Sequence, residues 1–262
     1  MAPPRKGETA LVTGASSGIG RELARLFAAD GYDVVLVARS AGALETLSGE
    51  IAREFGVTAT PIAIDLGEPN AVRDLMATLD QRALTIDVLV NNAGFGAAGP
   101  FDGSAAETQL GIIDVNIRAL VALTHRFWPA MLGKKRGGVL NVASTAAFQP
   151  GPFLAVYSAS KAFVLSFTEA LWEEARGTGV HVSCLCPGAT ETAFHKRAGT
   201  DKLHLLQMNM MSAEKAARLG YRAFQANKRV EITGALNAFM ARSAAVTPNA
   251  VVLRIARRLL SA

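Results

Sequence analysis

Short apolar runs alternate with longer segments of helical period over the first three quarters of the chain. Between Thr9 and Cys186, each apolar run ends in Gly, Asn, Asp or Ser, and the next segment repeats its apolar residues every three or four positions. These runs are too apolar for a sheet with one exposed face, so the pattern predicts an α/β fold with a doubly wound parallel sheet. The predicted strands are Thr9 to Thr13, Asp33 to Ala38, Thr58 to Ile64, Val88 to Asn91, Gly138 to Ala143, Val180 to Leu185 and Arg229 to Ile232.

Helices are expected between these strands, several of them after small polar residues that cap helix starts. Their predicted starts lie near Gly18, Ala41, Pro69, Ser104, Ser158 and Ser212. With 262 residues, half of them apolar, and no linker rich in Pro and Ser, the chain is expected to form a single domain over residues 1–262. Two segments depart from the repeating pattern, a predicted substrate lid at 189–228 and a C-terminal helical extension at 235–262.

The C-terminal extension combines apolar and basic residues in one helical pattern. Its apolar side consists of Val251, Val252, Ile255 and Leu259, and its basic side of Arg254, Arg257 and Arg258. A basic amphipathic helix can bind a membrane surface. Packing against the domain or against a partner subunit is the alternative, and it is the interpretation we favour from the sequence.

Composition and charge narrow the classes of partner. The net charge of +5 comes from scattered basic residues with one dense run, at 134–136, so a solvated basic surface is a better interpretation than a face that binds nucleic acid. The chain has no run of about 18 apolar residues and its first residues lack the layout of a secretory signal. The sequence therefore predicts a cytoplasmic protein without a transmembrane segment.

No metal site is expected from the four histidines and two cysteines. The histidines, His125, His181, His195 and His204, do not have the spacing of a ligand cluster. Cys184 and Cys186 share one face of a predicted strand about 7 Å apart, near or beyond the limit of disulfide reach. We expect them to be thiols of the core.

A glycine-rich turn joins the first predicted strand to the first predicted helix. Its Gly-x3-Gly-x-Gly spacing lets the backbone approach a pyrophosphate, and the helix start directs free N–H groups at it. The turn follows a strand in the first unit of a parallel, Rossmann-type sheet, which is the context that a dinucleotide-binding turn requires, and an ordinary tight turn is the alternative. The predicted cofactor contacts in the turn are Gly14, Ser16, Ser17, Gly18, Ile19 and Gly20.

The end of the second predicted strand indicates which dinucleotide is bound. An Asp or Glu is usual there for NAD, but this chain has Arg39 and Ser40, a planar cation and a hydroxyl suited to a 2′-phosphate. The prediction is NADP(H). The alternative is a surface arginine paired with Glu45 at the start of the next helix.

Several further motifs occur in a fixed order. They are Asp65 with Leu66, the Asn-Asn-Ala-Gly segment at 91–94, Asn116, the trio Ser144, Tyr157 and Lys161, and a Pro-Gly-x3-Thr stretch at 187–192. Together with the glycine turn, they make the sequence resemble the short-chain dehydrogenase/reductase family, in its Asn-Ser-Tyr-Lys branch, from Thr13 to Thr192. The resemblance implies cofactor contacts at Asp65, Leu66, Asn92, Ala93, Gly94, Tyr157, Lys161, Pro187, Gly188, Thr190 and Thr192.

The candidate catalytic residues also make chemical sense without the resemblance. Tyr157 and Lys161 lie one helical turn apart, and the ammonium is expected to favour ionisation of a phenol whose ordinary pKa is near 10. Tyr157 could then exchange a proton with a carbonyl or alcohol oxygen that Ser144 holds. By resemblance, Asn116 anchors a water on the proton path. The alternatives are a core tyrosine, a solvated lysine, a strand-end cap and an asparagine bonded to local backbone.

The substrate is expected to be a small carbonyl or alcohol compound, and an apolar ketone or acyl group is favoured. Phe95, residues 146–154 and the segment after Gly188 would set the choice. An amphipathic helix explains the apolar residues of that segment equally well, and an exposed charge cluster explains His195, Lys196 and Arg197 better than an anion site. The apolar residues in question are Phe194, Leu203, Leu205, Leu206, Met208, Met210 and Met211.

Two other functions compete with hydride transfer to a substrate. One is a non-catalytic protein that senses NADP(H), and the other is an epimerase or dehydratase that retains its nicotinamide. A homodimer or homotetramer is implied by the resemblance, with the segments 119–123 and 163–172 compatible with subunit contact.

Overall fold

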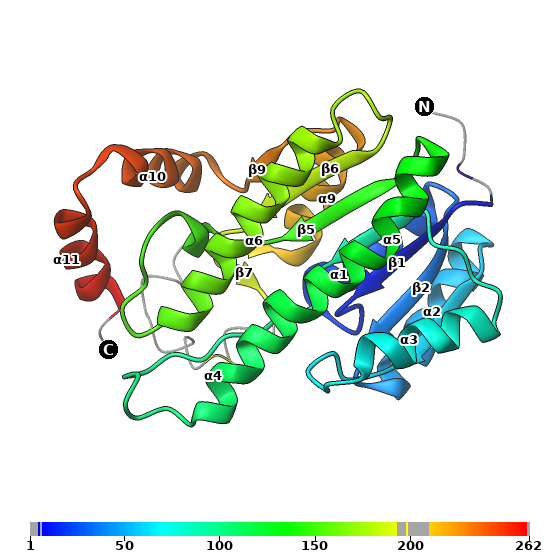
Figure 1. Ribbon diagram of the computed structural model, residues 1–262, viewed down its shortest axis with the longest axis horizontal. Coiled ribbons are helices and arrows are strands. Elements are labelled where there is room, and N and C mark those ends of the chain that lie inside the picture. The colour runs from blue at the N-terminus through cyan, green and yellow to red at the C-terminus, as the bar shows by residue number, and fades with distance from the viewer. Residues whose placement is uncertain (1–4, 6, 193–197, 199–209, 261–262) are drawn as a thin grey trace.

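A seven-stranded parallel sheet forms the centre of the protein. The fold comes from a computed structural model that describes residues 5, 7–192, 198 and 210–260 (Figure 1). The strand order β3-β2-β1-β4-β5-β6-β9 and the parallel pairing confirm the doubly wound α/β fold, and the predicted strand ends differ from the observed ones by at most one residue. The strands are β1 (Thr9–Thr13), β2 (Asp33–Ala38), β3 (Ala59–Ala63), β4 (Val88–Asn91), β5 (Gly138–Val142), β6 (His181–Cys186) and β9 (Val230–Ile232).

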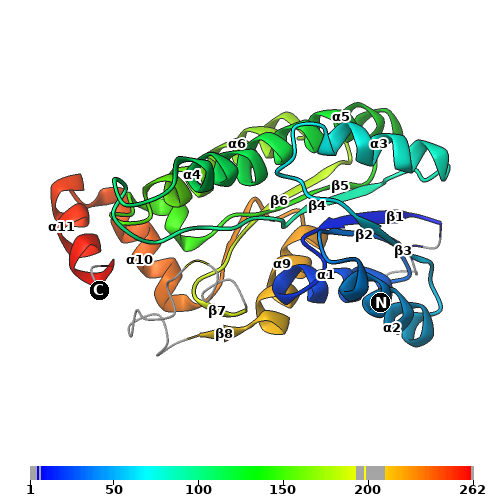
Figure 2. The ribbon, with the colours of Figure 1, turned by 90° about the horizontal axis from the view of Figure 1, so that it is seen from below.

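Helices cover both faces of the sheet, as the apolar strands require (Figure 2). One face carries α1 (Gly18–Ala29), α2 (Ala41–Phe55) and α9 (Ala213–Gln225). The other carries α3 (Ala71–Gln81), α5 (Leu120–Lys134) and α6 (Ala155–Glu174). A short helix, α4 (Ala106–Ile113), runs into α5 through a π-helical turn, η1 (Asp114–Ala119).

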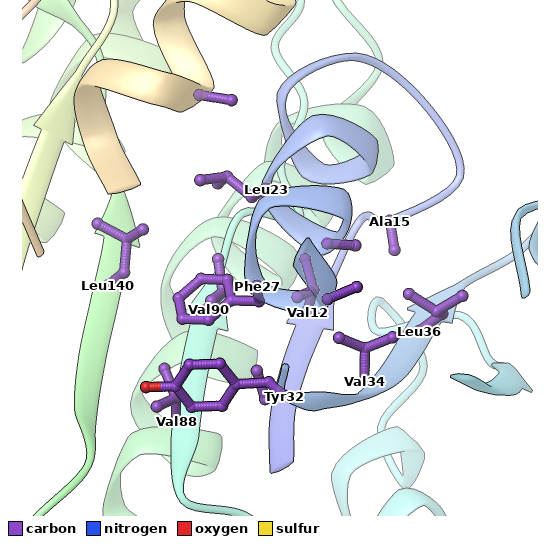
Figure 3. Packing of buried hydrophobic residues seen from close by; sticks show 14 of the residues in the cluster. Val12, Ala15, Leu23, Phe27, Tyr32, Val34, Leu36, Val88, Val90 and Leu140 are labelled. Atoms are coloured by element: carbon purple, nitrogen blue, oxygen red, sulfur yellow. The ribbon is translucent and has the colours of Figure 1, made fainter. Parts of the chain in front are cut away.

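The core on the α1 face is built around Phe27. Its ring meets Tyr32 and Tyr221 edge to face, with ring centroids 5.2 and 4.8 Å away, and it lies over the β-strand side chains seen in Figure 3. Tyr221 belongs to α9, so α9 is part of the core layer. The structure therefore differs from the predicted lid at 189–228: its part from Ala213 to Gln225 packs on the sheet, because the apolar stripe of this helix is buried there.

The strand order reverses between β1 and β4, which opens a crevice at the carboxyl ends of these two strands. Thr13 ties the two edges together, because its hydroxyl donates to Val90 O at 3.2 Å and accepts from the backbone N–H groups of Asn92 and Ala93, both at 3.0 Å. The glycine turn and the Asn-Asn-Ala-Gly segment thus lie side by side where a ligand can reach both.

The C-terminal extension forms two helices at one end of the molecule (Figures 1 and 2). They are α10 (Ala235–Val246) and α11 (Asn249–Leu260), separated at Thr247 and Pro248. A small parallel sheet of β7 (Thr190–Glu191) and β8 (Met211–Ser212), which the sequence pattern did not predict, lies nearby. Among the described helices, none is both long enough and apolar enough to cross a bilayer.

Candidate active site

A cleft of about 1230 Å³ lies at the carboxyl end of the sheet. It collects almost all the predicted site residues; Gly20 and Asn116 do not line it and lie behind its wall. The predicted residues that line it are Gly14, Ser16, Ser17, Gly18, Ile19, Arg39, Ser40, Asp65, Leu66, Asn92, Ala93, Gly94, Ser144, Tyr157, Lys161, Pro187, Gly188, Thr190 and Thr192.

The glycine turn forms one wall of this cleft with bare backbone. Gly14 has a φ of +66°, and a Cβ on it would lie 2.7 Å from Asn92 Nδ2. A Cβ on Gly20 would lie 2.3 Å from Gly14 O, so no side chain fits at either position. The start of α1 faces the cleft behind this wall, which fits the pyrophosphate of a dinucleotide.

Arg39 and Ser40 line the cleft just beyond the end of β2. Arg39 does not pair with Glu45; its guanidinium is 3.7 Å from Asp65 Oδ2, and its side chain is 68 % exposed. Asp65 Oδ1 accepts from Gly67 N at 2.9 Å. Glu45 was the carboxylate considered as a partner of Arg39 from the sequence, and in the structure the turn after β3 brings Asp65 beside Arg39 instead. An exposed, loosely paired guanidinium remains available to an anionic group.

Ser144, Tyr157 and Lys161 meet at the inner end of the cleft. The side chains of Tyr157 and Ser144 are hydrogen-bonded to each other. Lys161 lies one turn along α6 from Tyr157, with its ammonium 5.9 Å from the centre of the phenol ring. Its Nζ donates to Val142 O at 2.9 Å and the residue is buried, which rules out a solvated helix face.

Ser144 also has the second role considered from the sequence, that of a cap. Its hydroxyl accepts from Ala146 N at 3.1 Å and starts the 3₁₀ turn η2 (Thr145–Phe148). The cap fixes the serine rotamer toward the cleft. The capping and the contact with Tyr157 therefore support each other.

The side chain of Asn116, in η1, is held by residues outside its own helix. Its amide nitrogen donates to Phe95 O at 3.0 Å and to Ser160 Oγ at 2.9 Å, and its oxygen accepts from Phe95 N at 3.1 Å. A Cβ on Gly94 would lie 2.9 Å from Asn116 Oδ1 and 3.3 Å from Lys161 Nζ, so the two side chains flank the same glycine. Ser160, which the sequence analysis did not single out, positions Asn116.

Burial dominates the titration of the inner residues. It raises the pKa of Tyr157 to about 12, although the hydrogen bond from Ser144 opposes the rise. It lowers the pKa of Lys161 from 10.5 to about 8. The expectation that the ammonium would favour an ionised Tyr157 is thus not met in this structure: the phenol keeps its proton at neutral pH because both groups are removed from water.

The segment after β6 lines another part of the cleft. Gly188 N donates to Thr233 Oγ1 at 3.1 Å, and a Cβ on Gly188 would lie 2.2 Å from Asn237 Nδ2. Thr192 approaches Gly18 in the same way, since a Cβ on that glycine would lie 2.9 Å from Thr192 Cγ2. Thr233 and Asn237 fix this segment, and neither carries a sequence motif that would have identified it.

Other predicted features have a simpler outcome. No group of three or more His, Cys, Asp or Glu in the described part of the chain could hold a metal ion. Cys184 and Cys186 are buried free thiols with sulfurs 3.7 Å apart. Phe95 lines the cleft, and so do four of the residues at 146–154. Most of the predicted lid residues, Phe194, His195, Lys196, Arg197, Leu203, Leu205, Leu206 and Met208, lie outside the described residues.

Comparison with known proteins agrees with this geometry. The family model for short chain dehydrogenases matches residues 8–203. A very-long-chain 3-oxoacyl-CoA reductase of Laccaria bicolor is 38 % identical over 185 residues, which cover 69 % of this chain and 54 % of that protein. The matches with three curated relatives span only 54 to 61 % of those proteins' own lengths.

Solved structures with the same fold cover more of the chain. A short-chain dehydrogenase of Sphingobium yanoikuyae in complex with NADPH is 32 % identical, with a TM-score of 0.81 and coverage of 91 % of this chain and 93 % of that one. A bulky-bulky ketone specific alcohol dehydrogenase of Comamonas testosteroni is 28 % identical, with a TM-score of 0.77 and coverage of 90 % and 91 %.

The fold, the glycine turn and these matches define a class of nicotinamide-dependent oxidoreductases. The chain belongs to the short-chain dehydrogenase/reductase family.

Proposed function

We propose that this protein is an NADP(H)-dependent oxidoreductase of the carbonyl or secondary alcohol group of an apolar ketone or acyl-type substrate. The observation that carries the proposal is the meeting of Ser144, Tyr157 and Lys161 in the same cleft as the bare glycine turn. A protein that only senses NADP(H) would need the turn and Arg39 but no buried proton donor. The cluster therefore supports catalysis.

In this proposal, Ser144 and Tyr157 hold the reacting oxygen between two hydroxyl groups. The bound cofactor would supply the hydride, and the walls at Gly14, Gly94 and Gly188 would hold it. Tyr157 keeps its proton at neutral pH because burial raises its pKa, so it is suited to donate that proton to a carbonyl oxygen as the alcohol forms. Oxidation of an alcohol would use the same phenol in reverse.

Lys161 would return a proton to Tyr157 after each turnover, and Asn116 would hold a water on the path of that proton. Lys161 is anchored on Val142 O, and its lowered pKa, about 8, lets it give up a proton near neutral pH. Asn116, fixed by Phe95 and Ser160, lies beside Gly94 as Lys161 does, and its oxygen would hold a water there. This arrangement gives a path from the buried phenol toward solvent.

Preference for NADP(H) is proposed from Arg39 and Ser40 at the end of β2. A phosphate on the adenine-side ribose would replace the distant contact of Arg39 with Asp65 by a closer, charge-assisted hydrogen bond. The Sphingobium relative is solved with NADPH, which supports the same choice. Asp65, which the cofactor would also meet, limits the preference because its carboxylate lies near the same site.

The apolar substrate class is proposed from the outer part of the cleft. Phe95, Leu110 and Leu154 line one side, and Met240 and Ile255 of the C-terminal helices line the other. The lining also includes polar residues such as Gln149 and Thr247, but it is mainly apolar, which suits an apolar substituent better than a sugar or a small acid. The relatives named for very-long-chain 3-oxoacyl-CoA and for bulky ketones are consistent with a large apolar substituent.

A spectrophotometric screen tests this function. The purified protein is mixed with NADPH or NADH and a panel of ketones, aldehydes, quinones, sugars and 3-oxoacyl thioesters, and loss of the reduced nicotinamide is followed. Net consumption of NADPH with apolar ketones or acyl thioesters is expected. Binding of NADPH without turnover of any substrate would favour a non-catalytic protein that senses NADP(H). Epimerisation or dehydration without net loss of NADPH would favour an epimerase or dehydratase that retains its nicotinamide. Equal use of NADH would defeat the argument from Arg39.

Two accompanying expectations concern assembly and place in the cell. We propose a homodimer or homotetramer, with contact across an open groove of about 1020 Å³ between α3, η1, α5 and Phe163, where Met76 and Val121 offer apolar surface. Light scattering should give a mass of two or four chains. A cytoplasmic location, a single domain and the lid predicted at 189–228, without the helix α9, are kept as proposals, and cell fractionation and limited proteolysis would test them.

A further inference from the structure

The two C-terminal helices carry an unusual share of the exposed apolar surface. Seven of the eleven large hydrophobic residues that are exposed in the described part of the chain belong to α10 and α11. The extremes are Phe239, 68 % exposed, and Val246, 85 % exposed. The seven are Leu236, Phe239, Met240, Val246, Val251, Leu253 and Ile255. A surface of this kind marks a site of contact.

Among the described residues, few apolar side chains of these two helices are buried against the rest of the protein. In α10, Ala241 is the buried apolar side chain among those described, and in α11 Val252 and Ala256, one turn apart, are buried. Packing against the domain or a partner subunit was the interpretation favoured from the sequence; the packing against the domain uses Ala241, Val252 and Ala256 and leaves the larger apolar residues outside. Those residues are open to contact with another body.

Charge separates the C-terminal extension from the rest of the chain. Residues 235–262 contain four arginines and no Asp, Glu, Lys or His, whereas the other 234 residues contain 23 Lys and Arg and 22 Asp and Glu. Almost the whole net charge of +5 therefore belongs to this one end of the molecule. All four arginines, Arg242, Arg254, Arg257 and Arg258, are exposed.

We propose that α10 and α11 dock the protein on an anionic lipid bilayer. The exposed apolar side chains would enter the interface, and the arginines would contact the lipid phosphates. A second copy of the chain is a poorer occupant. A two-fold symmetric contact would set four arginines against four, with no carboxylate from the extension to compensate.

The docking site coincides with the mouth of the cleft. Phe239, Met240 and Ile255 line the cleft and are also exposed, so the cleft opens at this end. A bilayer bound here would present dissolved apolar compounds directly to the opening. The inference rests on surface and charge alone, and it would stand if the reaction proposed above were wrong.

Vesicle binding tests the proposal with the full chain and without cofactor. Co-sedimentation is measured with vesicles of phosphatidylcholine alone and of phosphatidylcholine with phosphatidylglycerol, at low and at molar salt. Binding is expected only with the anionic vesicles, and it should weaken at high salt because the Debye length shrinks to about 3 Å at 1 M. Failure of the wild-type protein to bind anionic vesicles at low salt would overturn the proposal.

Paired variants assign the binding to the extension. Arg254→Gln with Arg257→Gln should weaken partition into anionic vesicles about 30-fold, and Leu236→Ser with Val246→Ser about tenfold. The matched control is Arg53→Gln with Arg82→Gln, two exposed arginines elsewhere, which should change little. All six side chains are exposed, so folding is kept, as thermal melting would verify. Equal losses in control and test pairs would contradict the proposal.

The second-copy alternative has its own readout. Light scattering is run on the wild type and on the Leu236→Ser, Val246→Ser variant. An unchanged mass is expected. A drop in mass would show that another chain covers these residues and would overturn the membrane assignment. Turnover of a water-soluble ketone without vesicles should be the same in all these variants, which separates this test from that of the proposed reaction.

Discussion

The two walls of the cleft are built in opposite ways. The wall at the glycine turn is made of backbone from 13–20 and 92–94, packed so closely that a Cβ on Gly20 would lie 2.3 Å from Gly14 O. The wall at α10 and α11 is made of large side chains such as Phe239 and Met240, which are more than a third exposed. Backbone fixes atoms to within a fraction of an ångström, whereas exposed side chains adapt. The first wall suits an invariant cofactor and the second a variable substrate.

The largest effect is expected where the two walls meet, at Tyr157. Tyr157→Phe removes the proton donor but leaves the ring and the glycine wall, so kcat should fall about 10³-fold while the Kd for NADPH stays the same. Steady-state kinetics and fluorescence titration of NADPH measure the two quantities. An unchanged kcat would remove Tyr157 from the mechanism, and a lost affinity for NADPH would make it part of the cofactor wall.

Lys161 is expected to lower the stability of the protein while it is needed for activity. Because the folded-state pKa is about 8 and the unfolded value is 10.5, the unfolded chain binds more protons between these values, and stability rises with pH across that window. Below it the penalty for a buried charge is fully present. Lys161→Met should therefore stabilise the cofactor-free protein near neutral pH by on the order of 2 kcal/mol, since the lost bond to Val142 O offsets part of the gain.

The measurement is chemical unfolding of both proteins near pH 7 and near pH 10, with activity assayed in parallel. The advantage of the variant should shrink at the higher pH, and its activity should be lost. Tyr157 has the opposite effect on the pH dependence of stability, and only at more alkaline pH. Its pKa is about 12 in the folded state and near 10 in the unfolded chain, so the free energy of unfolding falls from pH 10 upward. A variant that is less stable near pH 7 would show that Lys161 is not penalised by burial.

The glycine wall should be intolerant of a single methyl group. Gly20→Ala is expected to lower the free energy of unfolding by about 2 kcal/mol and to weaken NADPH binding, because the added Cβ meets the Gly14 carbonyl. Gly49→Ala is the matched control, since a Cβ there meets nothing within 4 Å inside α2. The control should gain about 0.5 to 1 kcal/mol from helix propensity. Equal responses of the two variants would refute the close fit.

The smallest effect is expected at the adaptable wall. Met240→Ala should raise the KM for a bulky apolar ketone several-fold and leave kcat and the melting temperature unchanged, because the side chain lines the cleft but is half exposed. Leu236→Ala, on the same helix but outside the cleft lining, should change none of these values. A large loss of stability in Met240→Ala would show that this wall is as tightly built as the other.

What could be predicted from the sequence follows the same division. The strands and the glycine wall are set by local apolar runs and by motifs whose meaning depends on backbone geometry, and both were located to within a residue or so. The contact of Asp65 with Arg39 and the roles of Ser160 and Asn237 could not be predicted, because each depends on a partner distant in sequence: Arg39, Asn116 and Gly188. The pKa of Tyr157 was misjudged because burial, which a sequence does not show, raises it to about 12 and outweighs the hydrogen bond from Ser144.

The wide turn η1 has a consequence for the length of the chain. A π-helical segment holds more residues per turn than an α-helix, so α4 and α5 keep one continuous axis while their side chains are out of register with each other. Deleting a single residue from 114–119 would let the wide turn close into a regular helix, so that α4 and α5 keep their orientation while the side chains within the turn change direction. Asn116 would then lose its hydrogen bonds with Phe95 and Ser160. A change of one residue in the length of this segment would therefore remove Asn116 from the site while leaving the fold intact.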